Sequence, residues 1–472
     1  MNKKGFAVSG IIYSILILFL LLVFSILAIL GSRKLIIDKF KSDTLDKIYG
    51  NELEKEETIY RDSSGANSPE LLNNMIPIKY DGNNWVYADV KKEWYDYDAK
   101  EWANAVVLND GVIKEVGDTI TEDEITLWYV WIPRYTYTIF NGNNGSVDPL
   151  EIQIKFESGT NSSGTVKCVD AVSGSGTSSE TCTDSTNGSI VNGTSTYTHP
   201  AFTFGNQELK GFWVGKFEVS GSTSQITIKP NITSLRNQTV SSFFTAIQNM
   251  STTYSLNGDS HMIKNMEWGA VAYLSHSKYG TCTDGTCVEV GINNNSNYIT
   301  GCGATAGSSA SSTCNKYDTT TGILASTTGN IYGVYDMIGG AWEYVMGNMA
   351  NSSGIFYSSN AGFTTQNIPN SKYFNFYTYS TSYTTHGRGK LGDATKETLK
   401  TFGIEHGGWY GDASVLLDLT NSWIWRGGDY SGGPNAIGGV FLFYRYNGGI
   451  SVSGSTRAVL VKWLCYIKKY FI

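Results

Sequence analysis

Charge is scarce in this chain of 472 residues, of which only 16% are Asp, Glu, Lys or Arg. The formal net charge is −7, and no long block of like charge forms a tail. Because a protein that binds phosphate backbones needs a basic face, this balance excludes nucleic acid as the main partner.

Metal-ligating motifs are also lacking. The five histidines are scattered along the chain rather than clustered: His199, His261, His276, His386 and His406. The Asp/Asn/Gly loops offer donors that calcium accepts, but none has the acidic spacing of an EF-hand. We therefore expect no cofactor, keep calcium open and assign no metal.

Long apolar runs are limited to one segment, residues 11–30, which is long enough to span a bilayer as a helix. The alternative is a cleaved signal peptide, which is usually shorter and ends at a small-x-small site that residues 28–32 match poorly. The Lys3-Lys4-Gly5-Phe6 start resembles a type IV prepilin leader, but Gly10 stands where a pilin carries Glu. A pilin-like surface subunit therefore remains an alternative to an uncleaved anchor.

The orientation of this segment is ambiguous from its flanking charges. Lys3 and Lys4 favour an inner N-terminus, whereas the basic residues between positions 33 and 47 favour the opposite. The paired cysteines described next favour an outer C-terminal part. We expect a single-pass protein of the cell membrane with an extracellular C-terminal domain.

Six of the seven cysteines form close sequence pairs: Cys168 with Cys182, Cys282 with Cys287, and Cys302 with Cys314. Pairs that close local polar loops indicate disulfides in an oxidising compartment. Zinc is the competing interpretation, and only the spacing of Cys282 and Cys287 approaches a zinc knuckle. Cys465 is left over.

Glycine and tyrosine are abundant, at 52 and 30 residues, and this composition is typical of β-structure with long polar loops. Apolar periodicity predicts helices at 238–250 and 262–276. The expected parts are a short cytoplasmic N-terminus at 1–10, a transmembrane helix at 11–30, a helical stalk at 31–60, a small β-hairpin region at 61–120, a main domain at 121–461 and a tail at 462–472.

Four segments occur in an order that resembles a known family: residues 211–219 (GFWVGKFEV), 267–274 (EWGAVAYL), 329–345 (GNIYGVYDMIGGAWEYV), and 425–428 (WRGG) with a later Arg457-Ala458. They resemble the formylglycine-generating-enzyme, or sulfatase-modifying-factor, branch of the C-type lectin fold over about residues 125–461. The resemblance implies an α+β, C-type lectin-like domain with long loops, here preceded by one N-terminal transmembrane helix. The enzyme of that family uses two cysteines after its Arg-Gly-Gly, and residues 427–461 contain none. We therefore expect no enzyme activity, with a formylglycine-generating-type oxidase as the alternative.

The segment at 420–457 resembles, more narrowly, the variable proteins of diversity-generating retroelements. The resemblance implies a fixed frame made of Trp423, Arg426, Gly427, Gly428, Phe441, Phe443, Gly448, Gly449 and Arg457. It implies ligand-binding positions at Trp425, Asp429, Tyr430, Ser431, Asn435, Leu442, Tyr444, Arg445 and Tyr446. Tyrosine, asparagine and serine suit such positions because they combine contact area with adaptable hydrogen bonds. We expect a membrane-anchored, surface-displayed binding protein whose partner is an extracellular protein, a peptide or a glycan.

Overall fold

The chain divides into two units, 1–59 and 60–472. The computed structural model describes residues 59–142, 146–172, 178–184, 189–350, 356–357, 359–432 and 438–462, so the architecture reported below is that of the second unit.

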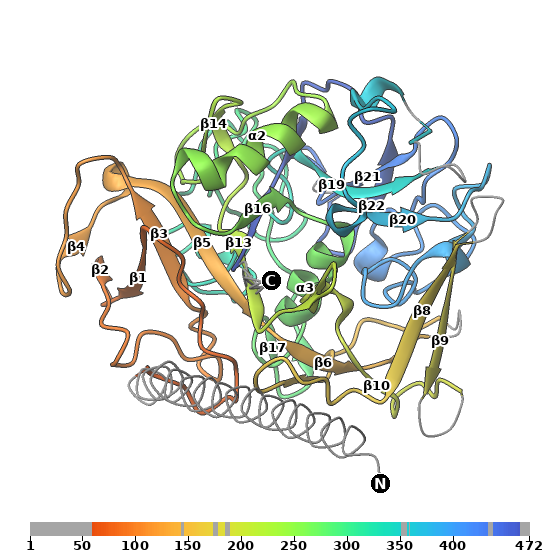
Figure 1. Ribbon diagram of the computed structural model, residues 1–472, viewed down its shortest axis with the longest axis horizontal. Helices are drawn as coiled ribbons and strands as arrows, with labels where there is room; N and C mark the ends of the chain where they lie inside the picture. Colours follow the sequence, from red (N-terminus) through yellow and green to blue (C-terminus); the bar gives the residue numbers. More distant parts are fainter. Residues whose placement is uncertain are drawn as a thin grey trace, which may run out of the picture. The chain divides into compact units, whose positions relative to one another are not determined.

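The larger sheet has eight strands, all joined antiparallel, in the order β16-β24-β13-β5-β3-β1-β2-β4 (Figure 1). Its strands are β1 (Met75–Tyr80), β2 (Trp85–Tyr87), β3 (Asn104–Leu108), β4 (Thr119–Ile120), β5 (Ile125–Pro133), β13 (Gly211–Gly215), β16 (Asp259–Met262) and β24 (Ala458–Val461). β5 is buried at all but one of its positions, because it lies inside the sheet and is covered on both faces.

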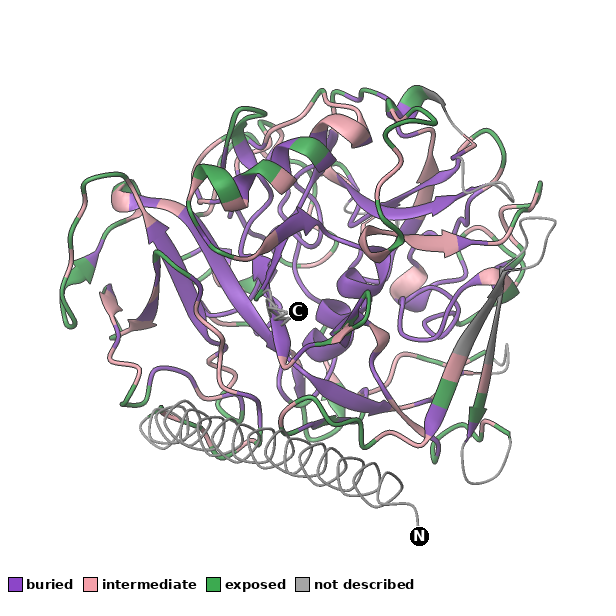
Figure 2. Ribbon diagram, viewed as in Figure 1, coloured by how far each residue is buried: buried purple, intermediate pink, exposed green. Residues whose placement is uncertain are grey.

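The smaller sheet carries most of the 420–457 segment. Its order is β20-β19-β21-β22, with β23 alongside β19. The strands are β19 (Trp342–Met349), β20 (Asn375–Tyr377), β21 (Trp423–Arg426), β22 (Phe443–Tyr446) and β23 (Gly454–Thr456). β21 is antiparallel to both β19 and β22, whereas β20 and β23 run parallel to β19. Figure 2 shows that β19 and β21 are largely buried and that β22 is partly exposed.

Two α-helices confirm the helices predicted from periodicity: α2 (Val240–Thr253) and α3 (Asn265–Ser275). The side chain of Thr239 caps α2 by accepting a hydrogen bond from the Ser242 backbone N–H. α2 lies beside β16 (Figure 1), and its buried residues are apolar. α3 is buried on all sides, which explains why its sequence is apolar around the whole helix.

Short strands and 3₁₀ turns connect these elements. The strands are β6 (Tyr135–Thr138), β7 (Ile154–Phe156), β8 (Val166–Val172), β9 (Ser178–Asp184), β10 (Thr196–Thr198), β11 (Thr203–Phe204), β12 (Gln207–Glu208), β14 (Ser220–Ser222), β15 (Gln225–Thr227), β17 (Cys282–Thr283) and β18 (Thr286–Cys287). The 3₁₀ turns are η1 (Glu122–Glu124), η2 (Pro200–Phe202), η3 (Gly322–Ala325), η4 (Ser359–Ala361), η5 (Ser371–Tyr373), η6 (His386–Arg388) and η7 (Trp409–Gly411).

Two expectations need correction. The α+β class is wrong for the described residues, which are mostly β-sheet with two α-helices, because most of the polar, glycine-rich sequence forms strands and turns. The expected single-pass membrane localisation is not supported either. In the described part of the chain no helix has the length and apolarity that crossing a bilayer requires: α2 has 14 residues, and a span needs about 20. The predicted membrane helix at 11–30 and the stalk before Ile59 lie outside the described residues.

Candidate functional site

Arg426, at the end of β21, is fully buried and binds three separate parts of the chain. Its Nε donates to Asn265 Oδ1 at 2.7 Å, and its Nη1 donates to the carbonyls of Ala394 and Leu442 at 3.1 Å each. Its Nη2 donates to the Asp393 carbonyl. Burial lowers the pKa of Arg426 to about 10, although neighbouring acids oppose this shift. Arg426 is therefore a frame residue that fixes β21 against α3 and against the residue that precedes β22.

Arg457, just before β24, joins the two sheets. It forms a two-point ion pair with Glu343 of β19, with Nε 3.2 Å from Oε2, and both side chains are fully buried. Nη1 and Nη2 also donate to the carbonyls of Gly215 and Tyr335, each at 2.8 Å. Burial raises the pKa of Glu343 to about 7, while Arg457 acts in the opposite direction.

The remaining frame residues are buried as well: Trp423, Gly427, Gly428, Phe441, Phe443, Gly448 and Gly449. Trp423 packs against the rings of Phe356 and Phe363. Gly427 has φ +77°, and a Cβ there would lie 2.9 Å from the Met337 carbonyl oxygen. A side chain at this position would be strained, so the turn after β21 depends on glycine.

Five aromatic residues share the opposite side of the smaller sheet from Arg426 and form what we call the aromatic face: Trp342, Tyr344, Trp425, Tyr444 and Tyr446. The register places Tyr344, Trp425 and Tyr444 directly opposite one another, and side chains two residues apart in a strand share a side. Trp342, Tyr444 and Tyr446 are partly exposed.

Trp425 lies at the centre of the aromatic face and is covered by its neighbours. Its ring stacks on Tyr446 at 4.0 Å with an interplanar angle of 11° and on Trp342 at 5.1 Å and 23°. Only 6% of Trp425 is exposed. Trp425 therefore holds Tyr446 and Trp342 in place, and these two rings, with Tyr444, supply the accessible surface.

A second group of predicted positions follows Gly428. The Tyr430 N–H donates to the Gly340 carbonyl at 3.0 Å, and its ring meets Tyr298 edge-on at 4.9 Å. The Arg236 guanidinium lies 3.8 Å from the centre of the Tyr298 ring. Burial, with Asp429 next in importance, raises the pKa of Tyr298 to about 12. Asp429 accepts hydrogen bonds from the backbone N–H and the hydroxyl of Ser431, at 3.0 and 2.6 Å.

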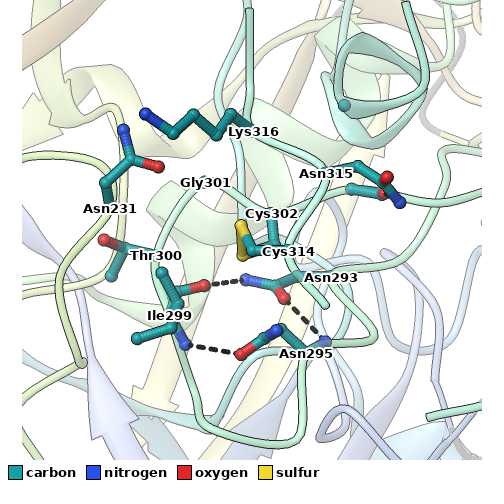
Figure 3. Close-up of a disulfide and its surroundings, with 12 residues drawn as sticks. Asn231, Asn293, Asn295, Ile299, Thr300, Gly301, Cys302, Cys314, Asn315 and Lys316 are labelled. Atoms are coloured by element: carbon teal, nitrogen blue, oxygen red, sulfur yellow. Dashed lines mark hydrogen bonds between the residues drawn. A yellow bond between two sulfur atoms is a disulfide. The ribbon is translucent and has the colours of Figure 1, made fainter. Parts of the chain in front are cut away.

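The loop that presents Tyr298 is braced from within. Figure 3 shows Asn293 Nδ2 donating to the Ile299 carbonyl, at 2.8 Å, and the Asn295 side chain accepting from the Ile299 N–H, at 3.4 Å. The Cys302–Cys314 disulfide closes the chain directly after this loop. A loop with such bracing keeps Tyr298 in position beside Tyr430 without a partner present.

Beneath this loop lie two buried carboxyl groups. Asp336 accepts from Asn293 Nδ2 at 2.7 Å and from the Gly301 N–H at 2.9 Å, and Glu218 accepts from the Ala341 N–H at 2.8 Å. Burial raises the pKa of both carboxyl groups, and in Glu218 the Asp336 charge adds to the effect. Their hydrogen bonds fix the loop and the turn before β19, so their role is structural.

Three predicted ligand positions differ from the rest. Leu442 is fully buried and belongs to the core. Arg445, on the other side of β22, forms an ion pair with Asp418 and lies over the Tyr383 ring at 4.1 Å. Asn435 lies outside the described residues.

Sequence reasoning missed Trp342, Tyr344, Tyr298 and Arg236 as members of these surfaces. The alternation of Trp342 and Tyr344 along one strand was a usable signal for the first two. Tyr298 and Arg236 reach Tyr430 only through tertiary folding, for which the sequence carries no local signal.

The three predicted disulfides are confirmed: Cys168–Cys182, Cys282–Cys287 and Cys302–Cys314. Within the described ranges, one group of side chains has the spacing of metal ligands, and it consists of His276, Cys282 and Cys287. Its two cysteines form a disulfide, and His276 already contacts the Leu150 carbonyl at 3.0 Å and the Tyr410 hydroxyl at 2.7 Å. This arrangement favours the disulfide over the zinc interpretation.

Neither a protein-family model nor a curated protein matches this chain. The frame and the aromatic face are therefore the features of this protein from which a function can be inferred.

Proposed function

We propose that this protein is a ligand-binding protein of the C-type lectin-like, retroelement-variable kind, and that the aromatic face is its recognition surface. The observation that carries the proposal is the division of the smaller sheet into two sides. Arg426, Glu343 and Phe443 are buried on one side, while partly exposed rings stack on the other. A rigid frame beneath amphipathic rings is a favourable recognition surface, because tyrosine and tryptophan supply contact area with little loss of entropy on binding.

The predicted partner is a protein, a peptide or a glycan. Tyr444 and Tyr446 offer hydroxyl groups beside apolar rings, and Trp342 adds a partly exposed indole. The Tyr444 hydroxyl is 3.5 Å from Glu405, so one carboxylate borders the surface. Tyr430 and Tyr298 extend the recognition area along the turn after β21.

The absence of an accessible thiol in this region favours binding over oxidation. Every cysteine among the described residues is in a disulfide, and Cys465 lies outside that part of the chain. Thiolate chemistry needs a free sulfur. Incubation with a cysteine-containing sulfatase peptide is therefore expected to yield no aldehyde by mass spectrometry, and aldehyde formation would favour the oxidase alternative.

Binding to glycan and peptide arrays tests the proposed surface. The double variant Tyr444→Ala with Tyr446→Ala is expected to lose the wild-type array signal, because it removes the accessible rings. Tyr379→Ala is the matched control, since Tyr379 is 39% exposed and lies outside the aromatic face. Equal binding by the wild type and the double variant would contradict the proposal.

Natural gene copies provide an independent test of diversification. Substitutions are expected at Tyr430, Tyr444 and Tyr446, and not at Arg426 or Gly427, because only the latter two are fixed by buried hydrogen bonds and backbone conformation. Copies that change at all five positions with equal frequency would refute a fixed frame.

A further inference from the structure

A cavity of about 1460 Å³ lies apart from the aromatic face, and we call it the basic groove. β8, β10 and the β11–β12 hairpin line it together with η5 and the first residues of α3. None of the five residues of the aromatic face lines this cavity. The groove is therefore a second place where a ligand can bind.

The charge of the groove is opposite to that of the whole chain. Its lining contains one carboxylate, Glu208, and five cationic residues: Arg134, Lys167, Lys264, Lys372 and Lys390. In a chain with net charge −7, such a concentration of cations defines a local site for a negatively charged ligand.

Carboxylates beside the groove balance part of this charge. Arg134 pairs with Glu157 at 2.8 Å and with Glu208 at 2.7 Å. Lys264 lies 3.4 Å from Glu267, and Lys372 lies 2.8 Å from Asp259. Four carboxylates thus offset most of the charge of the five cations and hold the paired ones in defined positions. The small positive excess suits a ligand with few negative groups rather than a dense polyanion.

Arg134 is the most informative residue of the lining. Its side chain is fully buried. Nε donates a hydrogen bond to Glu157, and Nη1 makes the other three hydrogen bonds of the guanidinium. Its other terminal nitrogen, Nη2, is buried without a hydrogen-bond partner among the described residues. An unpaired buried donor on a charged group is costly, and a bound oxygen would satisfy it.

The rest of the lining determines what kind of anion fits. The lining contains amide side chains, including Asn206, Asn370 and Asn375, together with hydroxyls such as Thr203 and the rings of Tyr197 and Phe374. Amides and hydroxyls bind hydroxyl groups, and rings pack against the C–H face of a sugar. The cavity also exceeds the roughly 300–1,000 Å³ typical of a drug-sized ligand, so it accommodates a short chain.

We propose that the basic groove binds an acidic oligosaccharide, with a sugar carboxylate accepting a hydrogen bond from Arg134 and neighbouring hydroxyls meeting the asparagines. Lys167, an exposed residue of the lining, adds long-range attraction. The binding is non-covalent and is independent of the aromatic face.

Calorimetric titration of the full chain with a short oligogalacturonate tests this proposal. Arg134→Lys keeps the charge but removes the second terminal nitrogen, and it is expected to weaken binding about tenfold. Lys167→Gln is expected to weaken binding about threefold, and because Lys167 is exposed this variant does not disturb the core. Lys155→Gln is the matched control, since Lys155 is exposed on the neighbouring β7 and does not line the groove.

Two further ligands test whether the groove prefers an acidic sugar over a neutral sugar or an acidic peptide, and one variant tests whether this binding is separate from the aromatic face. A neutral cello-oligosaccharide of equal length and an aspartate-rich peptide of equal charge are both expected to bind at least about tenfold more weakly. Equal binding of the peptide would identify an acidic-peptide site and refute the sugar proposal. Absence of oligogalacturonate binding, or an equal loss in Lys155→Gln, would also overturn it. Tyr444→Ala is expected to leave this titration unchanged, so failure here is distinguishable from failure of the proposed recognition surface.

Discussion

Replacing Arg457 with methionine is expected to be one of the most destabilising single changes in the frame. The variant leaves the buried Glu343 carboxylate without its partner and leaves two carbonyls, of Gly215 and Tyr335, without a donor. Breaking a buried ion pair costs about 3–5 kcal/mol. Because a domain is stabilised by roughly 5–15 kcal/mol in total, Arg457→Met is expected to remove a large part of the free energy of unfolding.

The double variant Arg457→Met with Glu343→Leu separates the charge from the packing. Replacing both partners by apolar groups is often neutral, so the double variant is expected to recover most of the cost of the isolated carboxylate. It is not expected to recover the cost of the two unpaired carbonyls, about 1–3 kcal/mol each.

Urea unfolding of the single and double variants measures these free energies, with the denaturation slope compared at the same time. Arg445→Met is the matched control from the same sheet, because the Arg445 and Asp418 side chains are 21% and 14% exposed. A more exposed pair contributes about 0–1 kcal/mol. A loss of unfolding free energy in Arg457→Met no larger than in Arg445→Met would contradict this role of the buried ion pair. A double variant as unstable as Arg457→Met would also contradict it.

Two further predictions concern acidity and covalent closure. Burial raises the pKa of Glu397 from 4.5 to about 7, so its stabilising contribution is complete below pH 4.5 and is lost as the pH rises through about 7. Glu397 alone is therefore expected to contribute a fall of on the order of 3 kcal/mol in the unfolding free energy over this window. A Glu397→Gln variant whose unfolding free energy depends on pH as steeply as that of the wild type would contradict the raised pKa of Glu397. The double variant Cys302→Ser with Cys314→Ser opens the loop of residues 302–314 that the disulfide closes, and it is expected to lose about 3 kcal/mol of unfolding free energy and to increase hydrogen exchange in the preceding loop, residues 293–301. Unchanged hydrogen exchange in residues 293–301 would show that the hydrogen bonds of Asn293 and Asn295 brace this loop without the disulfide.

Sequence patterns predicted the local features of this protein well. The apolar periodicity of residues 238–250 and 262–276 identified the helices α2 and α3, since one face of α2 and the whole of α3 are buried. The short cysteine spacings identified all three disulfides, because each closes a hairpin or a local loop. Residues 141–199 contribute β7 to β10 although they are rich in Gly, Ser, Thr and Asn, because polar residues pair through backbone hydrogen bonds as well as apolar ones do.

The sequence could not determine which of the aromatic residues are accessible. Trp425 was predicted to face a ligand, but Trp342 and Tyr446 cover its two faces, and this sandwich depends on the pairing of strands distant in the chain. Leu442 was expected outside and is buried beside the Arg426 guanidinium. The basic groove had no sequence signal, because its cations come from segments scattered between Arg134 and Lys390.

The position of β24 has a consequence for how the protein is made. This strand, the last one described, is inserted between β13 and β16 in the larger sheet, and its neighbour Arg457 ties that sheet to β19. A ribosome must therefore release almost the whole described chain before either sheet can be completed. Until then, β13 and β16 each expose an unpaired backbone edge, which is a site for mispairing with other chains. Newly synthesised molecules are thus most vulnerable to aggregation in the interval before Ala458–Val461 takes its place.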